Sequence, residues 1–197
     1  MGESIGLLKV IIVEGKRLAI RDFISSDPYV IVRVGELQIK WPLTKTMGWF
    51  NFAFSLEACT NFPSFIQNPM EKTKVIKRSL NPVWNEELTF SIKGPVTDLK
   101  LEVFDHDRFK FDDKMGHAYL SLQPIMSASK LKRALKLSTG ESETNLRKVA
   151  PNRDNCLIVD SSVTYVNGEI VQDVYLKLQD VESGELFVKL KWFDLST

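Results

Sequence analysis

Apolar and polar residues alternate in a series of short segments of this chain, and this period of two predicts β-strands. Asn167-Gly168 lies between two such segments, and this dipeptide is the strongest short-range signal for a β-hairpin. Only residues 124–137 show the apolar spacing of a helix. Many short strands without βαβ alternation predict an all-β fold, an antiparallel β-sandwich. The predicted strands are 6–14, 29–34, 72–76, 84–92, 99–103, 115–122, 163–166, 169–171, 175–178 and 186–192.

The composition is that of an ordinary globular domain. The chain has 197 residues, 44% hydrophobic and 26% charged, which suits one domain with a sizeable core. Its formal net charge of +1 offers no field that would attract nucleic acid. The two cysteines form neither a disulfide framework nor a zinc spacing, so we expect a reducing intracellular compartment. We find no signal peptide, myristoylation site or membrane-spanning apolar run, so we expect any membrane contact to be peripheral.

Five aspartates lie in two short stretches that adjoin predicted strands. Asp22 and Asp27 follow the first strand, and Asp105, Asp107 and Asp113 follow the fifth. In an up-and-down run of antiparallel strands, successive connections alternate between the two ends of the sheet. Both acidic connections follow odd-numbered strands. We therefore expect all five carboxylates at one end, together with the connection after the third strand.

Carboxylates gathered at one end repel each other unless a cation lies between them, and hard oxygen ligands favour Ca²⁺. The sequence therefore predicts a calcium site for one, two or more ions. Ca²⁺ takes roughly six to eight oxygens, so the backbone carbonyls of Phe23 and His106, lipid phosphate or water would complete the shell. The predicted carboxylate ligands are Asp22, Asp27, Asp105, Asp107 and Asp113.

Catalytic interpretations of these aspartates find little support. An EF-hand loop that starts at Asp105 needs Gly and Glu where Lys110 and Gly116 stand. A phosphoryl-transfer pair needs a hydroxyl residue where Phe109 stands. The spacing leaves a glycosidase pair open, but the sequence gives no signal for a deep cleft. We therefore do not expect an enzyme. The alternative to a calcium site is a set of solvated turn aspartates, and we prefer this interpretation for Asp112.

Apolar and basic residues flank the acidic stretches. Apolar tips can insert shallowly at the headgroup boundary, and each basic residue near an anionic membrane adds about 1 kcal/mol. Packing in the core is the alternative for the aromatic tips, above all for Phe111. The predicted membrane contacts are Phe23, Ile24, Arg108, Phe109, Lys110 and Phe111. A second basic set, whose alternative is a solvated strand face, is predicted as a lipid patch and comprises Lys72, Lys74, Lys77 and Arg78.

Two regions interrupt the simple strand pattern. Residues 39–71 are rich in Trp and Phe, carry few charges and lack clean alternation. Loops of this length are uncommon inside compact domains. We interpret residues 39–71 as an atypical insertion between the second and third strands, from retained intron sequence or a splice variant, and the alternative is a membrane-contacting loop. The second region, residues 127–172, is a basic excursion that includes the predicted hairpin.

Three parts of the sequence resemble the signature motifs of a C2 domain. They are SDPYV at 26–30, NPVWNE at 81–86, and VFDHD at 103–107 with DDKMG at 112–116. The resemblance implies an eight-stranded antiparallel sandwich with calcium at one pole, and it carries the ligand role onto the same five aspartates. The chain ends, GLL at 6–8 and LKW at 190–192, resemble plant small single-C2 proteins. The excursion, with PNRDNCL at 151–157, is similar to that of the C2-domain abscisic-acid-related proteins.

This resemblance implies calcium-dependent binding to acidic phospholipids and recruitment of abscisic acid receptors to the plasma membrane. We expect a peripheral protein at the cytoplasmic face of that membrane, in the cytosol and in the nucleus. Its expected partners are anionic membranes and signalling proteins such as abscisic acid receptors or a small GTPase, and no nucleic acid. The alternative is a protein-interaction module or GTPase-activating regulator, in which calcium only orders the loops and residues 130–173 bind the partner. An activator would need an arginine finger, and the sequence singles none out.

Overall fold

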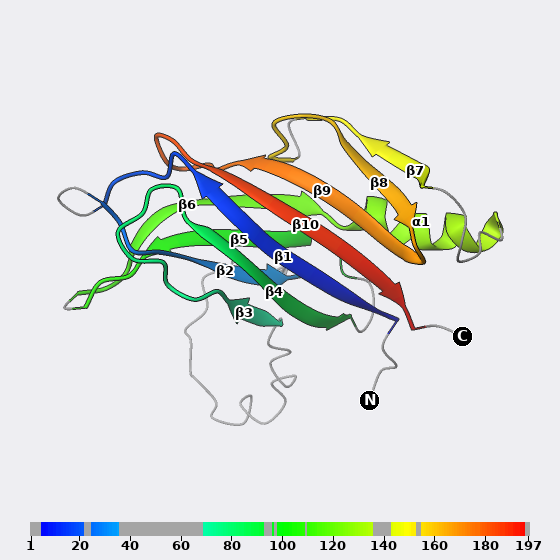
Figure 1. Ribbon diagram of the computed structural model, residues 1–197, viewed down its shortest axis with the longest axis horizontal. Coiled ribbons are helices and arrows are strands. Elements are labelled where there is room, and N and C mark those ends of the chain that lie inside the picture. Colours follow the sequence, from blue (N-terminus) through cyan, green and yellow to red (C-terminus); the bar gives the residue numbers. More distant parts are fainter. Residues whose placement is uncertain are drawn as a thin grey trace, which may run out of the picture.

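The computed structural model describes residues 5–21, 25–35, 69–92, 96, 98–108, 110–135, 143–152 and 155–195. Their strands form two antiparallel sheets that face each other (Figure 1). In chain order the elements are β1 (Gly6–Lys16), β2 (Pro28–Val34), β3 (Met70–Lys72), β4 (Val83–Ile92), β5 (Asp98–Asp105), β6 (Asp113–Ser121), α1 (Gln123–Ala134), β7 (Thr144–Val149), β8 (Ser161–Val166), β9 (Glu169–Lys177) and β10 (Glu185–Asp194).

The predicted eight-stranded sandwich is confirmed, and the excursion extends one of its sheets. Within the described residues, the sheet orders are β4-β1-β10-β9-β8-β7 and β3-β2-β5-β6. The strands β4, β1, β10 and β9 therefore oppose the four strands of the smaller sheet, and β8 and β7 are added at the edge of the larger one. The antiparallel prediction holds for every strand pair of the two sheets.

The core lies between the two sheets and follows the alternation seen in the sequence. Leu8, Val10 and Ile12 on β1 are fully buried, as are Leu101 and Val103 on β5. Each aliphatic side chain that is fully buried stabilises the fold by roughly 1.5–3 kcal/mol. Because β1 pairs with both β10 and β4, it is an interior strand of the larger sheet.

The hairpin between β8 and β9 is confirmed. Asn167 has φ 50° and Gly168 has φ 91°, and a type I′ turn needs two such left-handed residues. The predicted strands 169–171 and 175–178 form the single strand β9. Gln172, which lies between them, is buried, and its Nε2 donates a hydrogen bond to Ser161 Oγ at 3.0 Å. A buried polar side chain with a partner allows the strand to continue.

The boundaries of three further elements differ from the prediction. The predicted helix 124–137 is observed as α1, and β7 was not predicted because only Leu146 of that strand is buried. Strand β3 starts earlier than predicted, since Val32 and Arg33 pair with Glu71 and Met70. Residues 73–76 still run beside β2 but form no regular ladder. Positions 39–68 of the proposed insertion lie outside the described residues, so its interpretation stays a prediction.

One cross-connection joins the two sheets near the end that carries the acidic segments. His117 N donates to Gln179 O at 3.1 Å, and Gln179 N donates to His117 O at 2.7 Å. Beside this bridge Gly116 has φ +102°, and a Cβ there would lie 2.6 Å from Val181 Cγ1. Only glycine allows this close approach without strain. The connections after β1, β3 and β5 lie at this same end, away from the start of β1 (Figure 1).

Candidate metal centre

Hydrogen bonds between the three connections hold the acidic segments together. His106 N donates to Asp27 O at 3.1 Å, and Ser79 N donates to Ser26 O at 2.9 Å. Arg78 N donates to Asp27 Oδ1 at 2.8 Å, from a left-handed backbone with φ 54°. The Asp27 carboxylate thus fixes the turn that follows β3.

The strand register places Asp105 beside the first acidic segment and beside Asp113. Its Cα pairs with that of Pro28 on β2 and with that of Asp113 on β6. The Asp105 side chain is only 1% exposed, and its Oδ1 accepts a hydrogen bond from Asp27 N at 2.5 Å. Residues 78 positions apart in the sequence therefore meet at one pole, where the alternation of the connections had placed them.

A lysine ammonium lies between two of the predicted ligands. Lys110 Nζ is 3.2 Å from Asp107 Oδ2 and 3.0 Å from Asp113 Oδ2. Hydrogen bonds to Asp113 and Asp107 raise the pKa of Lys110 to about 12. A positive charge therefore occupies part of the space where the sequence predicted a cation between carboxylates.

Asp112 has an internal structural role that the sequence did not indicate. Its Oδ2 accepts a hydrogen bond from Tyr29 Oη at 2.6 Å, and its Oδ1 accepts one from Asp107 N at 3.0 Å. The same Oδ1 lies 3.2 Å from His106 Nδ1. Burial opposes ionisation of Asp112, but the hydrogen bonds, led by that from Tyr29, hold its pKa below the ordinary value. Burial and this hydrogen bond raise the pKa of Tyr29 to about 12.

A second interaction missed by sequence reasoning anchors the first acidic segment. Arg21 Nη1 and Nη2 donate to the two carboxylate oxygens of Glu182 at 2.9 and 3.1 Å, and Arg21 Nε donates to Lys114 O at 3.1 Å. The hydrogen bonds from Arg21 lower the pKa of Glu182. Arg21 N also donates to Ser26 Oγ at 3.0 Å. One side chain thus links the first acidic segment to β6 and to the connection between β9 and β10.

The chemistry of this pole fits calcium. Carboxylates are hard oxygen ligands, and they arrive here from two separate connections, β1–β2 and β5–β6. In the described part of the chain, no three His, Cys, Asp or Glu side chains are arranged as a metal-binding group. Asp22 and Phe23 lie outside that part. Binding of an ion between Asp107 and Asp113 also requires the Lys110 ammonium to move. The ligand roles of the five aspartates and of the two carbonyls therefore stay predictions.

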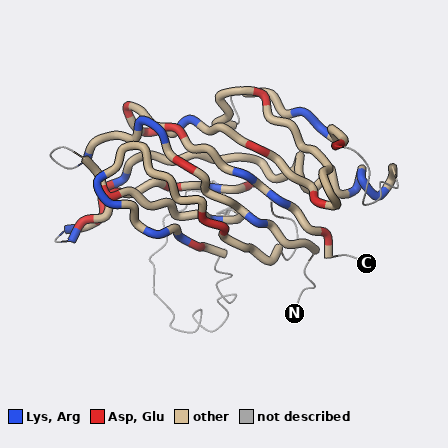
Figure 2. Tube along the Cα trace, in the orientation of Figure 1, with Lys and Arg blue, Asp and Glu red and all other residues tan. Residues whose placement is uncertain are grey.

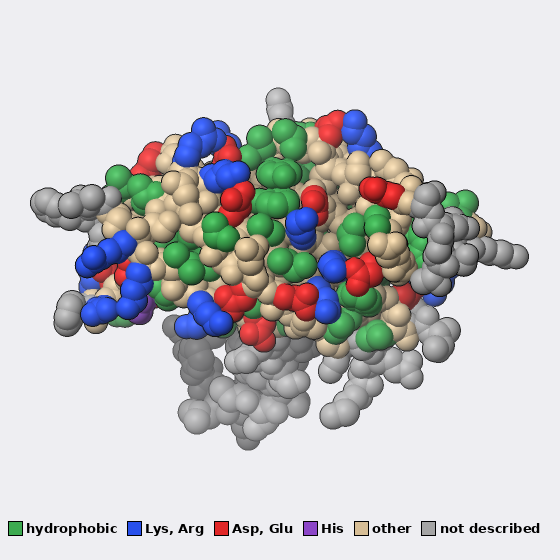
Figure 3. Space-filling model, in the orientation of Figure 1, with side chains coloured by type: hydrophobic (Ala, Val, Ile, Leu, Met, Phe, Trp, Pro, Cys, Tyr) green, Lys and Arg blue, Asp and Glu red, His purple; other side chains and the backbone are tan. Residues whose placement is uncertain are grey.

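The predicted membrane contacts that can be located are exposed. Phe111 is 96% exposed, which excludes core packing for this residue. Arg108 and Lys110 are exposed as well. Basic side chains gather at this end of the molecule, around the acidic ones (Figures 2 and 3). No described helix is both long and apolar enough to cross a membrane. Outside the described residues lie Phe23, Ile24 and Phe109.

The predicted basic patch divides into two parts. Lys77 and Arg78 are exposed in the turn after β3, close to the aspartates. Lys72 Nζ lies 5.7 Å from the centre of the Tyr29 ring. Lys72 and Lys74 help to line a cavity of about 430 Å³, whose walls are formed by Tyr29, Lys72, Thr73, Lys74, Val75, Glu86, His106 and Asp112. The Tyr29–Asp112 hydrogen bond therefore lies between this cavity and the acidic pole.

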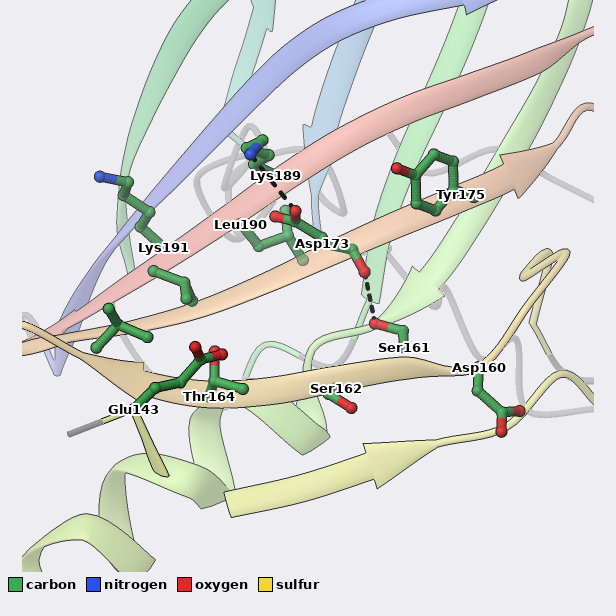
Figure 4. A pocket seen from close by; sticks show the side chains of 12 residues that line it. Glu143, Asp160, Ser161, Ser162, Thr164, Asp173, Tyr175, Lys189, Leu190 and Lys191 are labelled. Carbon is green, nitrogen blue, oxygen red and sulfur yellow. Dashed lines mark hydrogen bonds and ion pairs between the residues drawn. The ribbon is translucent and has the colours of Figure 1, made fainter. Parts of the chain in front are cut away.

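A second depression of about 440 Å³ lies on the outer face of β8, β9 and β10 (Figure 4). Its lysines pair with neighbouring acids, since Lys189 Nζ is 3.4 Å from Asp173 Oδ2 and Lys191 Nζ is 2.7 Å from Glu169 Oε2. The paired charges neutralise each other, so we assign this surface no ligand.

Two facing antiparallel sheets with acidic connections at one pole define this protein as a C2 domain. The family model described as C2 domain matches residues 6–57 and 61–137. The calcium-bound tandem C2 domains of Extended-Synaptotagmin 2 match with a TM-score of 0.56 and 20% identity, over 98% of this chain and 48% of that chain. The first C2 domain of plant Extended Synaptotagmin 1 matches with a TM-score of 0.50 and 20% identity, over 99% of each chain. At this identity the structures show the fold alone.

Sequence relatives narrow the class. C2-DOMAIN ABA-RELATED 11 of Arabidopsis thaliana is 47% identical over 194 residues, which is 98% of this chain and 96% of the relative. C2-DOMAIN ABA-RELATED 2 of the same plant is 36% identical over 100% of this chain and 93% of the relative. GTPase activating protein 1 of Oryza sativa subsp. japonica is 38% identical over 99% of this chain and 96% of the relative. The chain belongs to the plant C2-domain ABA-related family.

Proposed function

We propose that this protein is a calcium-dependent adaptor that binds anionic phospholipid surfaces through its acidic pole and recruits signalling proteins there. The observation that carries the proposal is the convergence of two connections, which bring Asp27 together with Asp105, Asp107 and Asp113 next to the exposed Phe111. The predicted partner Asp22 precedes Asp27 by five positions and would complete the carboxylate set. Membership of the C2-domain ABA-related family supports this choice over a solvated turn.

The pole combines fixed and adjustable ligands. Both Asp27 and Asp105 accept hydrogen bonds from backbone amides, and Asp105 is also buried, so these carboxylates are already positioned. Asp107 and Asp113 contact a flexible lysine side chain and can be released by a small movement of Lys110. Bound calcium would supply the positive charge that lets lipid phosphate oxygens approach this pole.

Residues around the ligands would then contact the membrane. Phe111 would insert its ring at the headgroup boundary, and Arg108 and Lys110 would approach anionic headgroups. Beside Phe111, the proposed inserting residues are Phe23, Ile24 and Phe109. We also propose that a second anionic headgroup binds to Lys72 and Lys74 in the 430 Å³ cavity. We place the protein at the cytoplasmic face of the plasma membrane, with pools in the cytosol and nucleus.

Co-sedimentation with phosphatidylserine vesicles tests the proposal. The wild-type protein should pellet in calcium and remain soluble in chelator, and the D107N/D113N variant should remain soluble in both. Asp173→Asn is the matched control, because Asp173 pairs with Lys189 on the outer face of β9, far from the proposed ligands. Equal pelleting of the wild type with and without calcium would reject calcium dependence.

Recruitment of an abscisic acid receptor is the partner function that we propose, because two relatives carry ABA-related names. Deleting residues 130–173 cannot test it cleanly, because Val163 and Tyr165 of this excursion belong to the core. Charge reversal of the exposed Lys130 and Arg147 preserves the core and should weaken receptor capture without changing vesicle binding. Retained receptor capture by a folded K130E/R147E variant would remove this surface from consideration.

Regulation of a small GTPase is a second candidate, favoured by the name of the rice relative. Arg21, Arg33 and Arg133 are engaged in ion pairs with acidic residues. Arg108 is exposed at the acidic pole and is the better candidate for insertion into a nucleotide site. Single-turnover GTP hydrolysis with wild-type protein and with R108A would decide it, since equal rates with and without the protein exclude the activity.

A further inference from the structure

Lys110 is distinguished from the other basic residues at the acidic pole by what its ammonium contacts. It lies 3.2 Å from Asp107 Oδ2 and 3.0 Å from Asp113 Oδ2, so that one positive charge joins two carboxylates. These carboxylates come from both sides of the connection between β5 and β6. The side chain of Asp107 is 12% exposed, whereas that of Lys110 is 58% exposed. The lysine therefore reaches inward from a solvent-exposed position.

The neighbouring cations do not duplicate this contact. The guanidinium of Arg21 is committed to Glu182, at 2.9 and 3.1 Å from its carboxylate oxygens. Arg78 contacts Asp27 through its backbone amide rather than its side chain. Lys114 is exposed and forms no ion pair with the described acidic residues. In the described part of the pole, Lys110 is thus the cation that bridges predicted calcium ligands.

We propose that Lys110 is a tethered counter-cation that competes with calcium for Asp107 and Asp113 and thereby sets the calcium concentration at which the pole responds. The inference rests on the proposed function, because it takes these two carboxylates as calcium ligands. Without the ion, the ammonium reduces the repulsion between the carboxylates and holds the connection together. With the ion, the ammonium must leave both carboxylates, and the cost of this displacement weakens the apparent calcium affinity.

This role predicts opposite changes in two measurements. Lys110→Gln removes the competitor, so calcium should bind more tightly; because exposed ion pairs are weak, the expected decrease in Kd is about fivefold. The same variant leaves the carboxylates unscreened without calcium, so its Tm in chelator should fall. A residue with only a structural role would lower the Tm without tightening calcium binding.

Lys114→Gln is the matched control, because it removes the same charge from the same pole without removing a carboxylate contact. Lys110→Arg keeps the charge and should resemble the wild type more closely than K110Q does. Calcium Kd is measured by isothermal titration calorimetry without lipid, and Tm is measured in chelator and in saturating calcium. The expected result is a Kd for K110Q about fivefold below that of K114Q, with a lower Tm in chelator only.

The outcomes separate this inference from the proposed function. If the wild type binds calcium and K110Q binds it no more tightly than K114Q, the competitor role is overturned while the calcium site stands. An unchanged Tm of K110Q in chelator overturns the counter-charge role in the same way. If the wild type and all three variants bind no calcium, the proposed function fails first, and the inference fails with it.

Discussion

The hydrogen bond between Tyr29 and Asp112 offers a quantitative test of how the acidic pole is held. Tyr29→Phe removes only the hydroxyl, which donates to Asp112 Oδ2 at 2.6 Å. Tyr29 is 8% exposed, and its ring stacks on Phe104 with centroids 5.8 Å apart, so the apolar packing survives. Hydrogen bonds to charged groups contribute roughly 1.5–3 kcal/mol when buried. Because Asp112 is partly exposed, we expect the free energy of unfolding to fall by about 1 kcal/mol.

A double-mutant cycle isolates this bond. Urea unfolding of the wild type, Y29F, D112N and Y29F/D112N in chelator should give a coupling of about 1 kcal/mol between the two positions. A loss of that size corresponds to a decrease in Tm of roughly 2–4 °C for a domain of this length. Single effects that add to within about 0.3 kcal/mol would refute the assignment of Asp112 as a brace.

The pH dependence of the same bond has a defined sign. Burial and the hydrogen bond to Asp112 raise the pKa of Tyr29 from 10.0 to about 12, so the folded state favours the protonated phenol. The resulting stabilisation is fully present below pH 10.0 and is lost as pH rises toward about 12. The stability difference between the wild type and Y29F should therefore shrink across this interval. If the stability difference between the wild type and Y29F stays constant over this pH interval, the pKa of Tyr29 is not raised by burial and the hydrogen bond to Asp112.

Three further predictions concern the membrane surface, the lysine cavity and the sheet connection. Phe111→Ser should weaken vesicle binding in calcium about tenfold, since apolar burial of this ring would add to the ionic attraction, and should leave the calorimetric calcium Kd unchanged. Lys72→Gln with Lys74→Gln should weaken binding of soluble inositol phosphates, measured by calorimetry, more than the outer-face control Lys189→Gln does. Gly116→Val should lower the Tm measured by thermal unfolding, because φ +102° and the 2.6 Å approach to Val181 Cγ1 leave no room for a Cβ.

The parts of the fold that could be predicted follow from local turn sequences and from the alternation of connections between antiparallel strands. The β8–β9 hairpin followed from Asn167-Gly168, because few other dipeptides adopt two left-handed residues in succession. The meeting of Asp27 with Asp105 followed from the alternation of antiparallel connections, which needs no knowledge of the side chains. The break expected in β9 was wrong, because the sequence does not show that Gln172 finds Ser161 as a buried partner.

Contacts that depend on long-range register were not predictable from one sequence. Tyr29 and Asp112 are 83 positions apart, and Arg21 and Glu182 are 161 positions apart. The sequence around each of these residues does not indicate which distant residue it contacts. Even the short-range contact of Lys110 with Asp107 and Asp113 depends on how the connection folds, since the same spacing in an extended strand would separate the charges.

The proposed function depends on the local arrangement of charge, because the chain as a whole is nearly neutral. The net charge is +1, and at physiological salt charges separated by more than about 8 Å are largely screened, so the total charge carries little information. In the proposed function a membrane would meet the local pole, where Lys110 lies within contact distance of Asp107 and Asp113. Without calcium, Lys110 is held by acids and is poorly placed to bind phosphate. If calcium binds as we propose, it would neutralise those acids and free a cation at the same time, so a small change in bound charge would produce a larger change in surface potential.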